Sequence, residues 1–149
     1  MRDKSKFRYA EKCLYEYKRN LAALDVLRED LRVERAGSDV HAQNYQFTFG
    51  FNNEPSNPVQ ARLIRLETLE DRIKKLERVT QPITRLINDL NSEENLESSN
   101  NKILYDILRL MYFGKNKPVV IRDELAISKR SFSLFRVELV MTAADYLAL

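Results

Sequence analysis

Two long stretches of this chain space apolar residues three and four positions apart, which keeps them on one face of a helix. The first stretch covers residues 4–34. Its apolar or small positions are Phe7, Ala10, Leu14, Tyr17, Leu21, Leu24 and Leu31. Arg28 breaks this heptad pattern once, and Leu27 lies beside the seam. The pattern predicts a long amphipathic helix whose apolar stripe needs a partner.

A second stripe of similar length begins after Asn57 and Pro58, which suit an N-cap and the first helical position. Its apolar positions are Leu66, Leu69, Ile73, Leu76, Ile83, Ile87 and Leu90. Two such stripes joined by a loop predict an antiparallel helical hairpin. Pro82 lies inside the second stripe and removes a backbone donor, so we expect a kink or restart near Thr80 to Pro82.

The connecting residues, 36–57, lose the helical period and are rich in glycine, asparagine, serine and proline. They contain the alternating aromatic residues Tyr45, Phe47, Phe49 and Phe51. This alternation allows a short strand or an arm, but we expect a loop that packs back on the helices.

The rest of the chain predicts a compact C-terminal head. Residues 92–101 are polar and mildly acidic, which is typical of a linker. Beyond them we expect one helix ending near Gly114, a second from Pro118 to Leu125, and a third from Ser128 to about Leu147. The expected fold is all-α: a coiled-coil-like hairpin over residues 1–91, for oligomerisation or as a scaffold, followed by a small helix-turn-helix head over residues 102–149.

The segment from Val120 to Phe135 has the spacing of a helix-turn-helix. Its expected core residues are Ile121, Leu125, Ile127, Phe132 and Phe135. Two of them lie four apart on the first helix and two lie three apart on the second, so one small core can hold all five. Ser128 suits the N-cap of the second helix. The motif departs from the usual pattern at Arg122, where a small residue is common, and at Ala126, where glycine is common.

A helix-turn-helix points to DNA, and its outward residues are the candidate contacts. The candidates are Ser128, Lys129, Arg130, Ser133, Leu134 and Arg136, together with Lys115 and Lys117. Between residues 115 and 136 there are six basic and two acidic residues. Lys129 and Arg130 can reach guanine acceptors or phosphates, Ser133 a base edge, and Leu134 a thymine methyl. The alternative is that Lys129 and Arg130 only solvate an exposed first turn.

Composition favours helix and binding rather than catalysis. The 149 residues include three glycines and four prolines, 32% are charged, and the net charge is +3. With Cys13 and His41 as the single cysteine and histidine, we expect neither a disulfide nor a zinc site. No Gly-rich phosphate loop or nucleophile elbow occurs in the sequence, so we expect no enzymatic activity and no cofactor.

Other charged residues support the same interpretation. The carboxylates at Glu67, Glu70, Asp71 and Glu77 alternate with basic residues, which is typical of an ion-paired helix face rather than a metal site. The basic residues near the N-terminus are equally consistent with phosphate contacts and with a soluble helix start. Without a leader or an apolar run of membrane-spanning length, we expect a location in the bacterial host cytoplasm and no membrane contact.

The C-terminal part resembles region four of bacterial sigma factors, from Leu108-Arg109-Leu110-Met111-Tyr112-Phe113 through the Leu125-Ala126-Ile127-Ser128 turn to Tyr146-Leu147. More narrowly, it is similar to the RinA and ArpU families of phage late-gene transcription activators. Those families also carry an N-terminal helical segment, and the Pro55-Ser56-Asn57 start of the second stripe is similar.

This resemblance implies binding to a promoter-proximal site and activation through the host RNA polymerase. It matches Lys129, Arg130 and Ser133 to base-facing places, and Phe132 and Phe135 to core places. Arg136 stands where sigma factors commonly carry glutamate.

The hypothesis from the sequence is a sequence-specific transcription regulator that binds double-stranded DNA as a homo-oligomer, with a dimer favoured. Two other classes stay open. One is a phage DNA-packaging protein like a small terminase subunit, and the other is a coiled-coil assembly or adaptor protein whose helix-turn-helix only packs.

Overall fold

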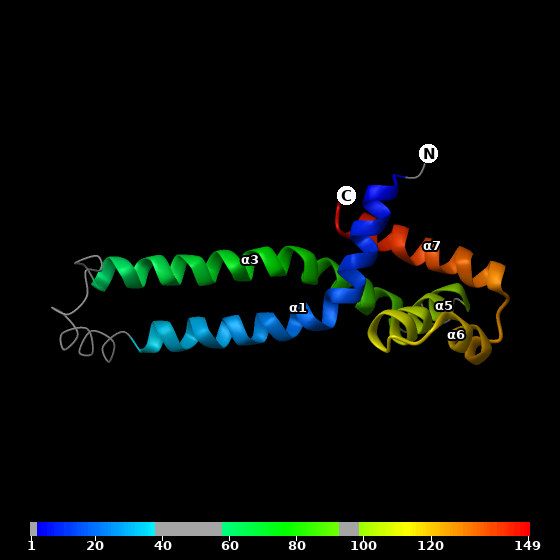
Figure 1. The fold of residues 1–149 in the computed structure, drawn as a ribbon, viewed down its shortest axis with the longest axis horizontal. Coiled ribbons are helices and arrows are strands. Elements are labelled where there is room, and N and C mark those ends of the chain that lie inside the picture. Colours follow the sequence, from blue (N-terminus) through cyan, green and yellow to red (C-terminus); the bar gives the residue numbers. More distant parts are fainter. Residues whose placement is uncertain (1–2, 38–57, 93–98) are drawn as a thin grey trace. The chain divides into compact units, whose positions relative to one another are not determined.

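The structure of the chain, a computed structural model, describes residues 3–37, 58–92 and 99–149. The described elements are α1 (Lys4–Ala36), α3 (Pro58–Leu90), α5 (Ser99–Ile107), the π-helix η1 (Leu108–Phe113), α6 (Pro118–Leu125) and α7 (Lys129–Tyr146) (Figure 1). Within these three ranges there is no strand, and the predicted all-α class is confirmed. None of the helices described has both the length and the apolar character needed to cross a membrane.

These helices form two compact units. Unit 1 comprises Met1–Asn20 and Arg78–Leu149, and unit 2 comprises Leu21–Glu77. The boundary between the units therefore lies within α1 and α3. It does not lie at residues 92–101, where the sequence suggested a linker. The reason is that the first five turns of α1 pack with the C-terminal helices: Ala10, Leu14 and Tyr17 of the first apolar stripe are buried in unit 1. The head expected over residues 102–149 therefore has an N-terminal component.

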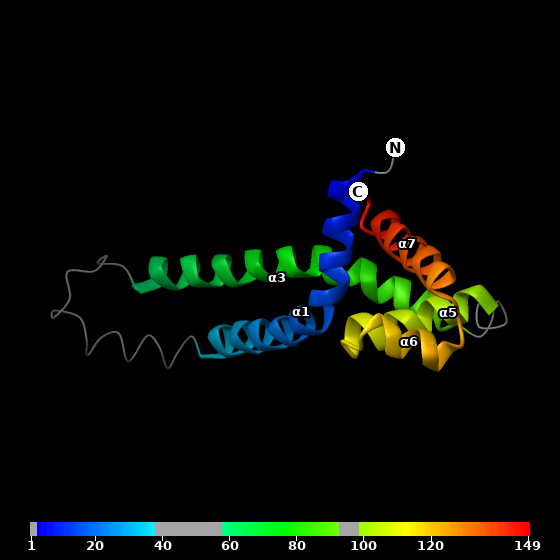
Figure 2. The same cartoon turned by 45° about the vertical axis from the view of Figure 1, so that its right-hand side comes forward.

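Unit 2 is an antiparallel pair of helices, Leu21–Ala36 of α1 beside Pro58–Glu77 of α3 (Figure 2). Arg28 pairs with Glu77 at 3.1 Å and Arg35 with Glu70 at 2.9 Å. Residue numbers therefore increase along α1 in the direction in which they decrease along α3, as expected for antiparallel helices. Leu24 and Ile73 are buried between them. The predicted hairpin is confirmed. The loop over 38–57, with its aromatic run, His41 and the Asn57 cap, lies outside the described residues.

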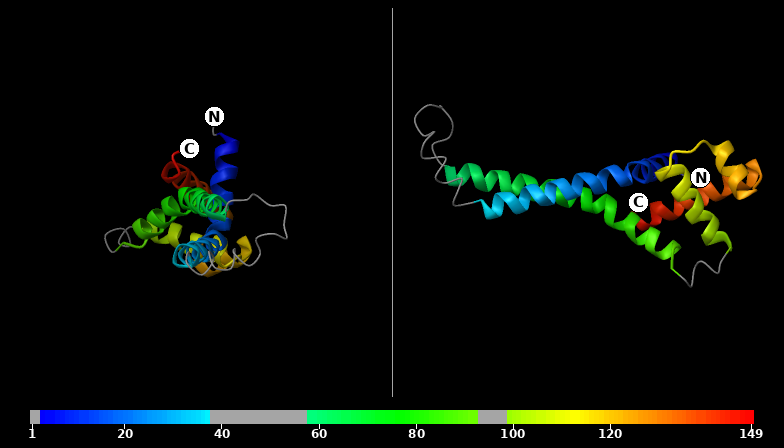
Figure 3. Two further views of the ribbon diagram at one scale, coloured as in Figure 1. Left: turned by 90° about the vertical axis from the view of Figure 1, so that its left-hand side faces the viewer. Right: turned by 90° about the horizontal axis from the view of Figure 1, so that it is seen from below.

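In unit 1, α5 packs against α7, and α6 packs on η1 (Figure 3). The last turns of α3 and the first turns of α1 complete the core, with Ile83, Leu86 and Leu14 almost fully buried. Of the kink or restart expected near Thr80 to Pro82, the restart does not occur, because α3 is one helix from Pro58 to Leu90. Pro82 and the neighbouring Thr80 and Ile83 are buried, and this burial offsets the hydrogen bond that proline removes.

The helix expected to end near Gly114 does so, but its last six residues, Leu108–Phe113, are a π-helix. The Gly114 N–H donates to the Arg109 carbonyl at 2.9 Å, five residues back. A Cβ at Gly114 would lie 2.9 Å from the Leu110 carbonyl oxygen, so this turn requires glycine. The wider turn leads the chain into α6.

Candidate nucleic-acid interface

The connection between α6 and α7 is a tight turn of three residues. Ala126 takes the left-handed conformation, with φ 54° and ψ 45°, and its N–H donates to carbonyls of the last turn of α6. Ile127 N–H donates to the Arg122 carbonyl at 3.1 Å. Glycine is usual at such a position because a Cβ is strained there. The turn thus keeps the geometry of a glycine-containing helix-turn-helix although it carries alanine.

Ser128 caps the start of α7, as predicted. Its Oγ accepts from the Ser131 N–H at 3.1 Å, and its backbone is extended. This hydrogen bond satisfies one of the unpaired donors at the helix start. α7 therefore begins at Lys129, with its first turn held in a defined orientation.

Five of the candidate DNA contacts lie together at this end of α7. Ser128, Lys129, Arg130, Ser133 and Leu134 are all exposed, and we call them the α7 N-terminal face. At 100° per residue, the four helical members span an arc of about 140° on one side of α7. Among the described residues, neither Lys129 nor Arg130 forms an ion pair, so the face carries two uncompensated positive charges.

The opposite side of α7 is buried, as the motif requires. Phe132 is 5% exposed and Ile121 of α6 is fully buried. Leu125, Ile127 and Phe135 are half-buried. This core fixes which side of α7 faces outward, and the C-terminal turns of the helix bury Leu139, Val140, Ala143 and Ala144 as well.

Arg136, which the sequence grouped with these candidate contacts, is not part of the α7 N-terminal face. Its Nε and Nη2 donate to Glu11 Oε1 on α1 at 2.9 and 2.5 Å. Its guanidinium also lies 5.8 Å from the centre of the Phe7 ring. The side chain is held inside unit 1 by a carboxylate, so its charge is compensated there.

Tyr112 of η1 completes this cluster. Its hydroxyl donates to the same Glu11 oxygen at 2.9 Å, and its ring meets that of Tyr15 edge-on, with centroids 4.6 Å apart. Burial, together with the negative charge of Glu11, holds the pKa of Tyr112 far above its ordinary value. The hydroxyl therefore stays a donor at neutral pH. We call Glu11, Tyr112 and Arg136 the Glu11 cluster.

The Glu11 cluster was not found from the sequence. Glu11 lies 101 residues from Tyr112 and 125 from Arg136, and no periodicity links them. Burial lowers the pKa of Arg136, but the hydrogen bonds with Glu11 and Tyr112 outweigh it and raise that pKa. The cluster joins α1, η1 and α7 and sets the orientation of α7 within unit 1.

Lys115 and Lys117 are exposed but lie at the other end of α6 from Ser128. Eight residues of α-helix rise about 12 Å, so these two lysines are separated from the α7 N-terminal face by the length of α6. Arg122 is half-buried, and its Nε lies buried without a hydrogen-bond partner among the described residues.

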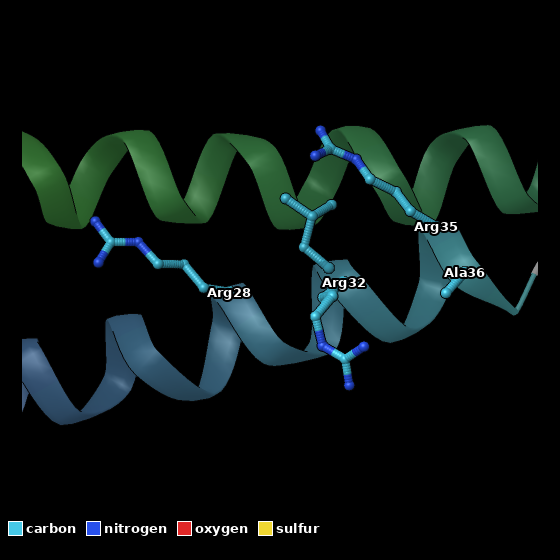
Figure 4. Close-up of a pocket in the computed structure, with 5 residues that line it drawn as sticks. Arg28, Arg32, Arg35 and Ala36 are labelled. Atoms are coloured by element: carbon cyan, nitrogen blue, oxygen red, sulfur yellow. The ribbon is translucent and has the colours of Figure 1, made fainter.

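A second group of arginines lies on α1 in unit 2. Arg28, Arg32 and Arg35 line a groove of about 520 Å³ with Leu31 and Ala36 (Figure 4). Their charges are compensated by glutamates: Arg28 by Glu77, Arg32 by Glu29 and Arg35 by Glu70. This group therefore lacks the free positive charge of the α7 N-terminal face.

No group of three or more histidine, cysteine or acidic side chains suited to a metal ion is found in the described part of the chain. Cys13 is buried in unit 1, and burial raises the pKa of its thiol. Compared with family models, curated proteins and solved structures, the chain matches none.

Proposed function

We propose that this protein is a sequence-specific DNA-binding transcription regulator, with α7 as its recognition helix. The observation that carries the proposal is the α7 N-terminal face at the capped start of a helix that follows a tight turn. It holds two hydroxyls, one aliphatic side chain and two cations that form no ion pair with the described residues. This set matches what base edges and phosphates offer in a major groove.

In this proposal each element has its own task. α6 lies across the sugar-phosphate backbone and α7 enters the groove by its first two turns. Lys129 and Arg130 donate to guanine or phosphate, Ser133 bonds a base edge, and Leu134 packs on a thymine methyl. The start of α7 adds the positive end of its helix dipole, which favours the phosphates.

The biological setting rests on the resemblance to region four of sigma factors and to phage late-gene activators. It implies a non-enzymatic activator that acts with the host RNA polymerase in the bacterial cytoplasm. The protein binds as a dimer, because a duplex with two half-sites matches the two-fold symmetry of such a reader.

Selection from random duplex DNA by the purified protein, at two salt concentrations, tests the proposal. We expect an enriched motif that is lost when Lys129 and Arg130 are both changed to alanine. Arg130→Ala alone should weaken specific binding by about 1 to 3 kcal/mol and relax one base position. The matched control is the double change of the exposed Lys74 and Arg78 to alanine, which removes the same charge from α3.

The other outcomes point to other functions. Equal loss of binding in both double variants would show that Lys129 and Arg130 contribute only through the net positive charge of the protein. Salt-sensitive binding without an enriched motif would favour a DNA-packaging protein. If the protein binds no DNA at either salt concentration, it is an adaptor whose helix-turn-helix only packs.

A further inference from the structure

One side of unit 2 carries aliphatic side chains that the described residues leave uncovered. Two grooves, of about 530 and 550 Å³, lie between α1 and α3 on this side, and both are lined by Arg72. Val26 lines the first and Val33 and Ile64 the second, and these three side chains are 61%, 48% and 56% exposed. Because the grooves share Arg72, they form one continuous surface, which we call the hairpin face.

The hairpin face is large relative to the core of the unit that carries it. In the described part of unit 2, only Leu24 and Ile73 are buried. A pair of helices with so thin a core gains stability when a second pair covers its apolar side, as in a four-helix bundle. Val26 and Val33 are seven residues apart, which places both on one side of α1, as in a seam between helices.

The charges on this face are divided between the helices. Those from α1 are acidic, Asp30 and Glu34, whereas those from α3 are basic: Arg65, Arg72 and Lys75. Glu34 and Arg65 pair with each other at 3.2 Å. Within the part of the chain that the structure describes, Asp30, Arg72 and Lys75 form no ion pair. An acidic strip thus lies beside a basic strip along the same apolar surface.

We infer that the hairpin face binds the hairpin face of a second copy of this chain, about a two-fold axis parallel to the helices. That axis places α1 of each copy on α3 of the other. Each residue then lies at the same level along the helix axes as the same residue of the second copy. The pairs Arg28–Glu77 and Arg35–Glu70 set Asp30 level with α3 residues near Arg72 and Lys75. Each copy then sets Asp30 against Arg72 of the partner subunit.

The charge pattern also excludes the other two-fold arrangement. An axis perpendicular to the helices would lay α1 on α1 and α3 on α3, opposing acid to acid and base to base. The inference rests on the dimer of the proposed function, not on its contacts with bases.

Sedimentation equilibrium of the full chain without DNA tests this surface. We expect a dimer whose Kd rises at least about tenfold on Ile64→Glu, because the change buries a carboxylate among aliphatic side chains. The matched control is Leu63→Glu, since Leu63 is 55% exposed on the same helix but lines neither groove. A monomeric parent chain, or a larger effect of Leu63→Glu, would overturn the inference.

Charge reversal tests the orientation. Asp30→Arg and Arg72→Asp should each weaken the dimer about five- to tenfold, because each two-fold interface contains the pair twice. The double variant should recover to within about threefold of the parent. Tighter association of either single variant would indicate the perpendicular axis. A double variant as weak as the single variants would show that Asp30 and Arg72 do not face each other in the dimer. Helicity by circular dichroism confirms that each variant is folded.

DNA binding by the same variants keeps this inference apart from the proposed function. If Ile64→Glu gives monomers that still bind the selected motif weakly at one half-site, both proposals stand. A protein that dimerises through the hairpin face but binds no DNA would leave the inference intact and overturn the proposed function.

Discussion

Ala126 holds a backbone conformation that costs an alanine more than a glycine. With φ at 54° its Cβ is crowded, and the left-handed conformation costs an L-residue about 1 to 2 kcal/mol. We therefore predict that Ala126→Gly raises the free energy of unfolding by about 1 kcal/mol, after the greater entropy of glycine in the unfolded chain is subtracted. Urea denaturation measures the change.

The control for this substitution is the same change in a helix. Ala22 is exposed within α1, so Ala22→Gly should lower the unfolding free energy by about 1 kcal/mol. Opposite signs for the two variants are expected. Two losses of similar size would mean that residue 126 is not left-handed in solution.

Glu11 is the residue on which three hydrogen bonds converge, and its side chain is only 15% exposed. We predict that Glu11→Ala lowers the unfolding free energy by about 1 to 3 kcal/mol, because Tyr112 and Arg136 lose their acceptor in a half-buried place. A double-mutant cycle with Arg136→Ala measures the coupling between the two side chains.

Glu29 supplies the comparison, since its bidentate pair with Arg32 is fully on the surface. Glu29→Ala should leave the denaturation midpoint almost unchanged, because water screens exposed pairs. Equal effects of the two substitutions, or no coupling between Glu11 and Arg136, would show that the Glu11 cluster does not hold α1 to α7.

The first two turns of α7 have one side for packing and one side turned to solvent, whereas Val140 and Ala144 bury the same angular positions further along the helix. Phe132→Ala should lower the unfolding free energy of unit 1 by about 3 to 5 kcal/mol, as expected for a large-to-small change in a core. Leu134 is two residues away and 59% exposed, so Leu134→Ala should stay within about 0.5 kcal/mol of the parent. Thermal melts compare the two, and a reversed order would mean that α7 is rotated.

The same element shows where local sequence signals suffice. Ser128 and Pro118 mark the starts of two helices by their own chemistry, a hydroxyl that caps and a ring that needs no N–H donor. The π-helix of Leu108–Phe113 has no such signal. It packs against α5 and α6, and a periodicity analysis does not include such contacts.

At the scale of the whole molecule, unit 1 is built from both ends of the chain. We predict that a fragment of residues 99–149 lacks a cooperative unfolding transition, because it loses Leu14, Tyr17 and Ile83 from the core. A chain in which a flexible linker of about ten residues replaces residues 21–77 should retain that transition. Calorimetry compares the two, and a stable 99–149 fragment would show that the C-terminal helices fold without α1.

Features that depend on residues close together in the chain could be predicted without a structure. Heptad spacing was enough for the hairpin, because a helix turns every 3.6 residues and an apolar stripe must be covered. Two core pairs, Ile121 with Leu125 and Phe132 with Phe135, were enough for the helix-turn-helix and its outward face, together with Ile127 and Ser128 between α6 and α7. These elements carry the proposed function.

Which of those elements pack together became known from the three-dimensional arrangement of the helices. Tyr17 donates or accepts a hydrogen bond with Thr84 at 2.7 Å, and Arg136 meets Glu11 across 125 residues. Such pairs depend on the path of the chain in space, which local periodicity does not record. For that reason Arg136 was assigned to DNA by its place on α7, and the division of α1 between two units was visible only once its neighbours were known.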